Sequence, residues 1–515
     1  MYSRHAKAGP LAARPRPGLP VESESPWIDT RPYPPRPLLP LPRAVDVVVV
    51  GAGITGVTAA VLLKAAGKTV ALLEAQRAAE GVTGYTTAHL TELLDCPFTT
   101  LLSHFGEEET RRAVHGVRAS LDMIAGFVRD RRIDCDYRRV PGFYYTEKDH
   151  NAEDLQREFD AARRLGLEVS WTTEVPLPFP VKAALRLENQ ARFHVRDYLL
   201  PLLQSIPGDG SSVFEETRVV DVQDGEPCVV KTEREEIAAT DVVVATHVPL
   251  NRLFLQTKVA HYRSYALGCR VAASVADALY WDDDDPYHYT RLAQIEGEPL
   301  LIVGGEDHKV GQEKDAEGRF EALLDYAHER FGVRQVEYRW SAQVAEPVDG
   351  LPFLGRNSLS SHVYVGTGYS GTGMTFGTLA AMIASDLILG RDNPWADVLD
   401  ATRIKPLAGA RKFVAENVDY PAHMVGDRLK APDERSLEEL ARGEGSLVKV
   451  DGKKRAAFRD ESGSVRVLDP VCPHMGCLVA WNAAEKSWDC PCHGSRFDTD
   501  GTVLDGPALT GLKPV

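Results

Sequence analysis

The feature that most constrains the fold is the stretch from Val45 to Ala75, which reads VDVVVVGAGITGVTAAVLLKAAGKTVALLEA. It begins with a short, continuously apolar run rich in β-branched residues, as expected for a strand buried on both faces of a sheet. A glycine turn, a helical segment and a second apolar strand follow, and Glu74 closes that strand. Strand-like and helix-like stretches then alternate as far as about residue 400. This order indicates an α/β fold.

Three glycines within that stretch form the pattern GxGxxG. The first permits a tight turn, the second lets the backbone approach a pyrophosphate, and the third lets helix and sheet pack closely. The pyrophosphate would lie at the positive end of the following helix, and the acidic residue that closes the second strand suits a ribose diol. Because the whole strand–turn–helix–strand context is present, we predict nucleotide binding. The expected contact residues here are Gly51, Gly53, Ile54, Thr55, Gly56, Glu74 and Ala75.

The two ends of the chain differ from this region in composition and in the expected secondary structure. Residues 1–44 are rich in proline, which disfavours helix and central strand. They form either a disordered segment or an extended arm that Trp27 anchors on the folded domain. Residues 401–440 have the composition of a connector. From residue 441 to residue 515 short strands alternate with tight turns, which indicates an antiparallel all-β module.

The eight cysteines are unevenly placed. Four are scattered and are expected to be small buried hydrophobic residues: Cys96, Cys135, Cys228 and Cys269. The other four fall between residues 472 and 492, with two histidines among them. In a reducing compartment such a cluster indicates a metal site rather than a framework of disulfides.

Each of two loops in this cluster offers one thiolate and one imidazole. Cys472 and His474 form Cys-x-His, and Cys490 and His493 form Cys-x-x-His. Two cysteines can therefore hold one iron and two histidines the other, which is the ligand set of a Rieske [2Fe–2S] cluster. A pair of zinc knuckles is the alternative, because Zn²⁺ also binds sulfur and nitrogen. We predict a Rieske cluster.

The same region resembles the Rieske proteins of respiratory cytochrome bc complexes. The resemblance implies a disulfide between Cys477 and Cys492 that joins the two cluster loops. It also implies a hydrogen bond from Ser495 to a bridging sulfide, whereas the next donor, a tyrosine in those proteins, is replaced here by Phe497. We therefore expect a reduction potential below that of the respiratory class and above that of clusters lacking both donors. A Rieske oxygenase is disfavoured, because it needs a second, mononuclear iron site.

Four stretches upstream resemble the D-amino-acid-oxidase-like family of FAD-dependent flavoproteins. They are 81–91 (GVTGYTTAHLT), 242–250 (VVVATHVPL), 339–356 (RWSAQVAEPVDGLPFLGR) and 363–388 (VYVGTGYSGTGMTFGTLAAMIASDLI). The resemblance implies FAD as cofactor and a helix N-terminus facing the flavin, where its dipole stabilises the reduced form. It adds these contact residues: Thr83, Thr86, Thr87, Val219, Thr246, Gly368, Gly371, Thr372, Gly373 and Met374. A class A flavin hydroxylase and a plain NAD dehydrogenase fit less well, and covalent attachment of FAD, for example to His89, stays open.

The family topology implies a Rossmann-like FAD-binding domain with an inserted α+β substrate domain, together spanning residues 45–400. The flavin segments would be 45–135, 200–255 and 345–400, and the substrate segments 136–199 and 256–344. Within the substrate segments Arg263, Tyr265 and His308 are the candidate catalytic residues, and Asp307 is a candidate for orienting a polar substrate. Each of these residues fits a purely structural role equally well.

Composition narrows the partners. The net charge of −15 argues against nucleic acid or anionic lipid as the main partner. No apolar run approaches the ~20 residues needed to span a bilayer. The N-terminal sequence has no pattern of an export signal, so a cytoplasmic location is expected.

A flavin takes two electrons as a hydride equivalent, whereas a Rieske cluster takes one at a time. We therefore predict an FAD-dependent dehydrogenase that oxidises a C–N bond of an amine or amino acid. Its electrons would pass singly through the cluster to an external redox protein or quinone, leaving by exposed histidine ligands. Two alternatives stay open: an oxidase that uses O₂ directly and has a regulatory cluster, and an electron-transfer or redox-sensor protein without a small organic substrate.

Overall fold

A computed structural model describes residues 16–20, 23–250, 253–405 and 436–515. Most of the predicted connector and the first residues of the N-terminal arm lie outside these ranges. Within them, no helix combines the length and apolar character needed to cross a bilayer.

The first sheet has eight strands and surrounds the N-terminal βαβ unit. Its main order is β16-β17-β10-β1-β2-β7, with β9 paired to β10 and β8 paired to β9. The central strand β1 runs parallel to both of its neighbours, and its valines at positions 47, 48 and 49 are fully buried. Its strands are β1 (Ala44–Val50), β2 (Val70–Leu73), β7 (Ser212–Phe214), β8 (Val219–Gln223), β9 (Cys228–Thr232), β10 (Glu236–Val244), β16 (Phe353–Arg356) and β17 (Val363–Thr367).

Helices cover this sheet and bring its glycine turns together. Helix α2 (Ile54–Ala65) follows the first turn and packs against α8 (Gly373–Ile388) and α5 (Val195–Gln204). The long helix α3 (Phe98–Asp130) packs against α8 as well. All eight strands come from the three segments expected to build the flavin domain, apart from the first residue of β1.

The second sheet has nine strands in the order β15-β11-β14-β13-β12-β4-β6-β3, with β5 beside β6. Helix α7 (Ala316–Phe331) packs on β11 and β14, and α4 (Ala152–Arg164) packs on β5 and β6. Its strands are β3 (His89–Leu90), β4 (Arg138–Thr146), β5 (Val169–Thr172), β6 (Ala183–Arg192), β11 (Val259–Val271), β12 (Leu279–Asp282), β13 (His288–Ile295), β14 (Glu298–Lys309) and β15 (Val333–Pro347). Strand β3 and the end of β15 belong to this second sheet, although they come from segments that were expected to build the flavin domain. The predicted segment boundaries therefore differ from the sheet boundaries at these two places.

The described part of the N-terminal arm lies against the folded domain. It contains the short helix α1 (Pro26–Asp29), which Ser25 caps. The Trp27 side chain is 1% exposed, and its Nε1 donates to the carbonyl of Thr86 at 2.6 Å. Ser25 Oγ donates to the carbonyl of Gly84 at 2.6 Å. The arm thus holds the segment that was expected to pass along the flavin.

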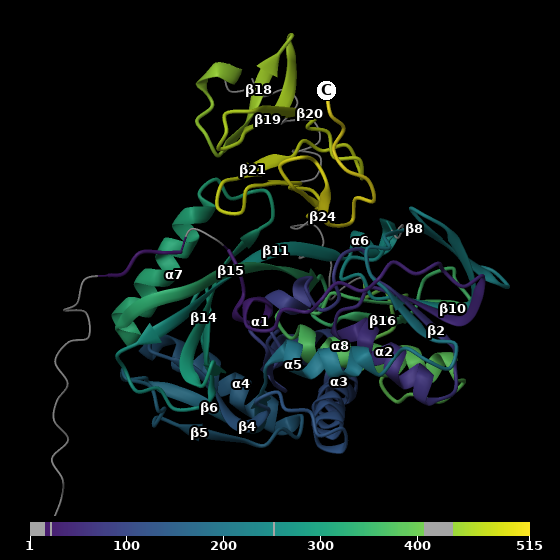
Figure 1. Cartoon of the computed structure of the whole chain (residues 1–515). Helices are drawn as coiled ribbons and strands as arrows, with labels where there is room; N and C mark the ends of the chain where they lie inside the picture. The colour runs from purple at the N-terminus through teal and green to yellow at the C-terminus, as the bar shows by residue number, and fades with distance from the viewer. Residues whose placement is uncertain (1–15, 21–22, 251–252, 406–435) are drawn as a thin grey trace, which may run out of the picture.

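The C-terminal module consists of two small antiparallel sheets, as the sequence predicted for an all-β domain. The first contains β18 (Glu444–Val450), β19 (Lys453–Arg459) and β20 (Val465–Leu468), and the second contains β21 (Ala480–Asn482), β22 (Ser487–Asp489), β23 (Arg496–Phe497) and β24 (Val503–Asp505). Figure 1 shows this module, in yellow-green and yellow, above β11 and β15 of the nine-stranded sheet. The prediction of an α/β flavoprotein fold followed by an all-β domain is confirmed.

Candidate active site and metal centre

A cavity of about 580 Å³ lies where the two sheets meet the glycine turns. The N-termini of α2 and α8 both reach it, so two positive helix ends point at one space. Ten of the residues predicted to contact FAD line it: Gly53, Ile54, Thr55, Thr83, Thr86, Thr87, Gly371, Thr372, Gly373 and Met374. The other seven, Gly51, Gly56, Glu74, Ala75, Val219, Thr246 and Gly368, do not belong to the lining.

The first glycine turn fits a bound dinucleotide. A Cβ on Gly56 would lie 1.8 Å from the carbonyl oxygen of Gly51, so only glycine allows helix and strand to pack this closely. The Glu74 carboxylate accepts hydrogen bonds from the N–H groups of Ala52 at 2.7 Å and Gln76 at 3.0 Å. Burial raises the pKa of Glu74. Helix α2 has glycine as its N-cap, so no N-cap side chain occupies the helix end at which a phosphate would bind, and the N–H of Ile54 donates to Thr83 Oγ1 at 3.1 Å.

His89 lines the cavity from the short strand β3. Its Nδ1 lies 3.2 Å from Thr87 Oγ1, and its buried Nε2 has no hydrogen-bond partner. Burial, together with the charge of Arg291, lowers the pKa of His89 to about 3. A neutral imidazole therefore faces this part of the cavity.

The three candidate catalytic residues do not line the cavity. Arg263 instead forms a two-pronged ion pair with Glu485 of the C-terminal module, at 3.1 and 2.5 Å. Tyr265 is fully buried, and its hydroxyl lies 2.8 Å from His308 Nε2. Its ring packs on Phe320 of α7. All of these contacts lie on the face of the sheet that α7 and the C-terminal module cover.

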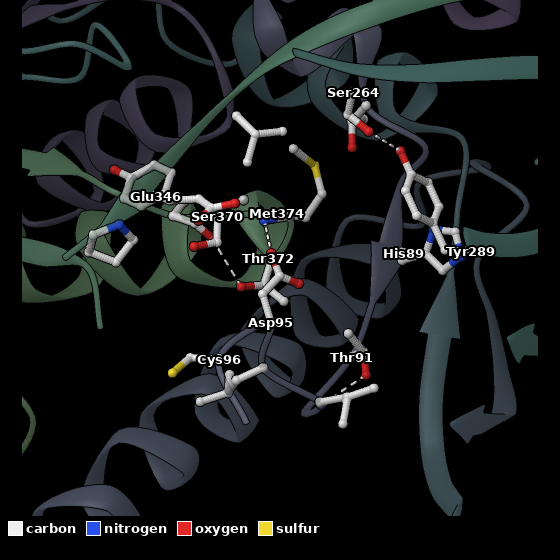
Figure 2. A pocket seen from close by; sticks show the side chains of 18 of the residues that line it. His89, Thr91, Asp95, Cys96, Ser264, Tyr289, Glu346, Ser370, Thr372 and Met374 are labelled. Carbon is white, nitrogen blue, oxygen red and sulfur yellow. Dashed lines mark hydrogen bonds between the residues drawn. The ribbon is translucent and has the colours of Figure 1, made fainter. Parts of the chain in front are cut away.

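Alternate residues of the same strands face the cavity, because side chains alternate across a sheet. Ser264 lines it, and its Oγ lies 3.0 Å from the hydroxyl of Tyr289 (Figure 2). Asp307 lies within reach of Ser264 and Tyr287. Burial raises the pKa of Asp307 to about 7, and the charges of nearby carboxylates add to the shift, against the hydrogen bond from Ser264.

Further lining residues were not singled out from the sequence. They include Asp95, His247, Trp281, Tyr287, Tyr289, Gln343, Glu346 and Tyr369. Several of them are neighbours, one strand position away or across a ladder, of residues that were singled out. For those on strands, Trp281, Tyr289, Gln343 and Glu346, strand alternation is the only signal, and without a known register it does not tell the two faces apart.

The four predicted cluster ligands converge at the tip of the C-terminal module. The side chains of Cys472 and Cys490 are 1% and 2% exposed and lie within hydrogen-bonding distance of each other. The rings of His474 and His493 have their centres 4.9 Å apart and are nearly perpendicular. Two thiols side by side and two imidazoles side by side match the two-iron ligand set.

Neighbouring residues support this centre. Burial lowers the pKa of both ligand histidines to about 4, so each is in the neutral form that binds metal. A disulfide joins Cys477 to Cys492, with a Cα–Cα distance of 6.5 Å, and both sulfurs lie within 4.8 Å of the Cys490 sulfur.

Two positions bear on the reduction potential. The Ser495 hydroxyl accepts from the N–H of Ala508 at 3.0 Å and forms a hydrogen bond with the Cys472 side chain. Phe497 is fully buried in the core of the module and brings no donor to the cluster. The structure thus supplies one of the two side-chain donors found in respiratory Rieske proteins.

The histidine edge of the module lies against the flavoprotein rather than open to the outside. His474 is half-buried, and its Nε2 lies 2.8 Å from Oε1 of Gln256. Gln343 Nε2 donates to the carbonyl of Gly494, next to His493, at 2.7 Å. The expectation that exposed imidazoles offer the electron exit therefore does not hold in this arrangement, because residues of β15 and α6 (Leu253–Gln256) occupy that side.

The comparisons agree with both halves. The FAD dependent oxidoreductase family matches residues 46–387, and the Rieske [2Fe-2S] domain matches residues 433–515. The chain therefore belongs to the FAD-dependent oxidoreductases and carries a C-terminal Rieske domain. It is an enzyme of this family, with FAD and a Rieske [2Fe–2S] cluster as cofactors.

Individual proteins share this organisation or part of it. YhfW of Bacillus subtilis, named as a Rieske 2Fe-2S iron-sulfur protein, is 33% identical over 496 residues, which is 96% of this chain and 97% of that protein. The γ-glutamylputrescine oxidoreductase of Escherichia coli is 24% identical over 361 residues, 67% of this chain and 84% of that protein. The crystal structure of glycine oxidase from Geobacillus kaustophilus aligns over 70% of this chain and all of its own, with a TM-score of 0.59 and 20% identity.

Proposed function

We propose that this enzyme oxidises a C–N bond of an amine or amino acid and passes the electrons singly through its Rieske cluster to an external redox protein or quinone. The observation that carries the proposal is the position of Gln343. Gln343 is among the residues that line the flavin cavity, and its side chain donates to the carbonyl of Gly494, beside the cluster ligand His493. One residue therefore touches both the cavity and the cluster loop.

When bound, FAD supplies the two-electron acceptor and the cluster supplies the one-electron carrier. The substrate carbon gives up a hydride equivalent and the nitrogen a proton. The resulting C=N bond is hydrolysed by water to a carbonyl compound and an amine or ammonia. The residues of the protein position the substrate over the flavin. The packed side chains between the flavin cavity and the cluster exclude water.

Two buried histidines support this role of the wall. His247 lines the cavity, and its ring centre lies 6.4 Å from that of His261, which packs against Gly494. Burial lowers the pKa of both histidines, so both rings are neutral. Two neutral, packed histidine side chains therefore lie between the cavity and the loop that carries His493.

The printed names of two similar proteins support the reaction class. One is an oxidoreductase of γ-glutamylputrescine and the other an oxidase of glycine, and each name denotes a compound with a C–N bond. The contact through Gln343 favours a dehydrogenase over an oxidase in which the cluster only regulates. Cys96, Cys135, Cys228 and Cys269 form no disulfide among the described residues, which fits our proposal of a cytoplasmic location.

Anaerobic bleaching tests this proposal. The purified holoenzyme is mixed with a library of amines and amino acids without oxygen, and the flavin spectrum and the cluster EPR signal are followed in the same samples. We expect at least one compound to bleach the flavin and then to produce the signal of the reduced cluster. Bleaching that is reversed only by O₂, with the cluster still oxidised, would favour the oxidase, and bleaching only by a reduced protein would favour the electron-transfer protein.

A further inference from the structure

One hydrogen bond ties a predicted cluster ligand to the flavoprotein part of the chain. His474 Nε2 lies 2.8 Å from Oε1 of Gln256, although the two residues are 218 positions apart in the sequence. Gln256 is the last residue of α6 and is only 3% exposed, and His474 is half-buried. Water therefore competes little for this bond. A contact to the outward nitrogen of a ligand histidine acts on the metal through that ligand.

The orientation of the Gln256 amide decides which of its atoms faces the ring. Its Nε2 donates to the carbonyl oxygen of Pro249 at 2.9 Å. A carbonyl oxygen only accepts, so the amide nitrogen must point at Pro249 and the amide oxygen at His474. The opposite orientation would bring two oxygen acceptors together at Pro249. The hydrogen bonds on both sides thus fix the amide in one orientation.

The fixed amide places the proton on the His474 ring. The amide oxygen of Gln256 only accepts, so Nε2 of His474 carries the hydrogen of this bond. The neutral imidazole that binds a metal has a single N–H, which leaves a lone pair on Nδ1. His474 therefore presents Nδ1 to iron and its Nε2–H to Gln256. This is the arrangement by which an outer partner holds a ligand histidine in one tautomer and one ring orientation.

Gln256 is itself held from the flavin side of the molecule. Pro249 lies in the loop 245–250 that follows β10, and Ala245 and His247 of this loop line the flavin cavity. Beside the Rieske loop, Gln256 borders a second cavity of only about 10 Å³. A space of that size holds no more than about one water molecule. The glutamine is therefore packed in place, with its two amide atoms joining the flavin loop to the ligand ring.

We propose that Gln256 is a positioning residue of the Rieske centre, supplied by the flavoprotein domain, which holds His474 by its Nε2–H and lowers the reduction potential of the cluster. An acceptor on the outward N–H makes a ligand imidazole more basic. A more basic ligand gives more electron density to iron and favours the oxidised state. The inference goes beyond the proposed oxidation of a C–N bond and does not depend on the substrate.

A redox titration of the full-length holoenzyme, followed by EPR without any substrate, tests this role. Gln256→Met keeps the length of the side chain and removes the acceptor. We expect a higher reduction potential and shifted g values of the reduced cluster. Loss of an outer partner weakens metal binding about 10–100-fold in other metal sites, so the chelator concentration that removes half of the iron should fall about tenfold.

A second variant and a matched control separate the ligand bond from the domain contact. Gln256→Asn keeps an amide but is one methylene shorter, so it cannot reach His474 and Pro249 together and should also raise the potential. It gives the answer if Gln256→Met fails to fold. The control is Gln343→Met, because Gln343 is buried at the same contact but donates to the backbone carbonyl of Gly494 and not to a ligand ring.

Pulsed EPR of the ligand nitrogens completes the comparison. The outward nitrogen of one of the two ligand histidines should change in both Gln256 variants, and neither should change in Gln343→Met. An unchanged or lower potential in a Gln256 variant that keeps its cluster would overturn the proposal, as would an equal rise in Gln343→Met. Failure of both Gln256 variants to assemble a cluster would also overturn it, since the residue would then be needed for assembly rather than for tuning. Because no amine is present, none of these results bears on the proposed reaction.

Discussion

The flavin cavity and the iron–sulfur centre are built in opposite ways. The centre is made of four side chains from two loops of one small β-module, and the residues beside it come from the same module or from one docked face. The cavity is made of helix ends, a glycine loop and strand faces that come from distant parts of the chain. A site made of local side chains can be recognised from spacing, whereas a site made of strand faces depends on which way each strand turns its residues.

The nine-stranded sheet joins these two regions and keeps them apart. Ser264 and Glu346 face the cavity, whereas Arg263 and His261 on the same sheet face the Rieske domain. Gln343 is the residue that touches both sides. The flavin cavity and the predicted cluster ligands therefore lie on opposite sides of one sheet, and we propose that side chains of β11 and β15 set the electron path between them.

The largest effect should come from removing a cluster ligand. Cys490→Ser is expected to abolish bound iron and the EPR signal of the reduced cluster, because serine replaces a thiolate that iron requires. FAD content should stay as in the parent enzyme, since none of the four ligands lines the cavity. Iron and flavin analyses on the purified protein measure both.

Cys228→Ser is the matched control for that variant. Cys228 is fully buried, but its sulfur already lies near the carbonyl of Gly225, so a serine hydroxyl finds an acceptor there. It should keep both cofactors. Loss of FAD together with iron in Cys490→Ser alone would show that the two regions do not form independently.

The next effect concerns the contact between the regions. Arg263 and Glu485 have side chains only 9% and 6% exposed, and Arg496 binds the same carboxylate. Arg263→Met leaves part of this buried charge without its partner and should lower the free energy of unfolding by about 3 kcal/mol. Denaturant unfolding gives this value.

Arg270→Met on the same strand serves as the control. Arg270 pairs with Glu337, and both side chains are 25% exposed, so its loss should cost less than about 1 kcal/mol. Equal losses in the two variants would remove the claim that a buried ion pair holds the Rieske domain on the sheet.

A smaller effect should depend on pH. The pKa of Asp307 is raised in the folded protein to about 7, so folding favours its neutral form. The stability that this gives is complete below the carboxyl pKa of the unfolded chain and is lost as the pH rises through about 7. Asp307→Asn should therefore become more stable than the parent by about 2 kcal/mol on going from about pH 4 to about pH 8.

Thermal or denaturant unfolding across this pH range measures the difference. Asp392→Asn, at an exposed aspartate, should show no such trend. A stability difference for Asp307→Asn that stays flat with pH would mean that this carboxyl is not shifted by its place beside the cavity.

The smallest effect concerns the tuning of the cluster. Phe497→Tyr would add a donor near a ligand sulfur, worth about 1 kcal/mol or on the order of 40 mV for a one-electron couple, and should raise the reduction potential. Ser495→Ala removes the existing donor to Cys472 and should lower it. EPR-monitored redox titration compares the three proteins, and an unchanged potential in both variants would contradict the account of the donors.

The residues expected to hold the two cofactors could be predicted from the sequence more completely than the residues that line the cavity. The glycines at 51, 53 and 56 and the four cluster ligands were predictable, because each is required by its own chemistry at a fixed spacing. Tyr265 and His308 have the right chemistry, but they pack under α7. A shift of one residue along a strand reverses its face, so the place of Ser264 in the cavity lining follows only from the three-dimensional register.

The docking of the histidine edge could not be predicted either. Gln256 and Gln343 lie far from the cluster in sequence and carry no motif, yet they contact His474 and the loop of His493. Such contacts depend on how two domains pack, which no local pattern encodes.

The most direct test of the central claim is the order and the concentration dependence of reduction in a single anaerobic turnover. After an amine is mixed with the holoenzyme in a stopped-flow instrument, the flavin should bleach first and the cluster should be reduced in a second phase. If the electron crosses the sheet within one molecule, the rate of that second phase is the same at every protein concentration. A second phase whose rate rises in proportion to protein concentration, or a cluster that stays oxidised after the flavin has bleached, would contradict the account.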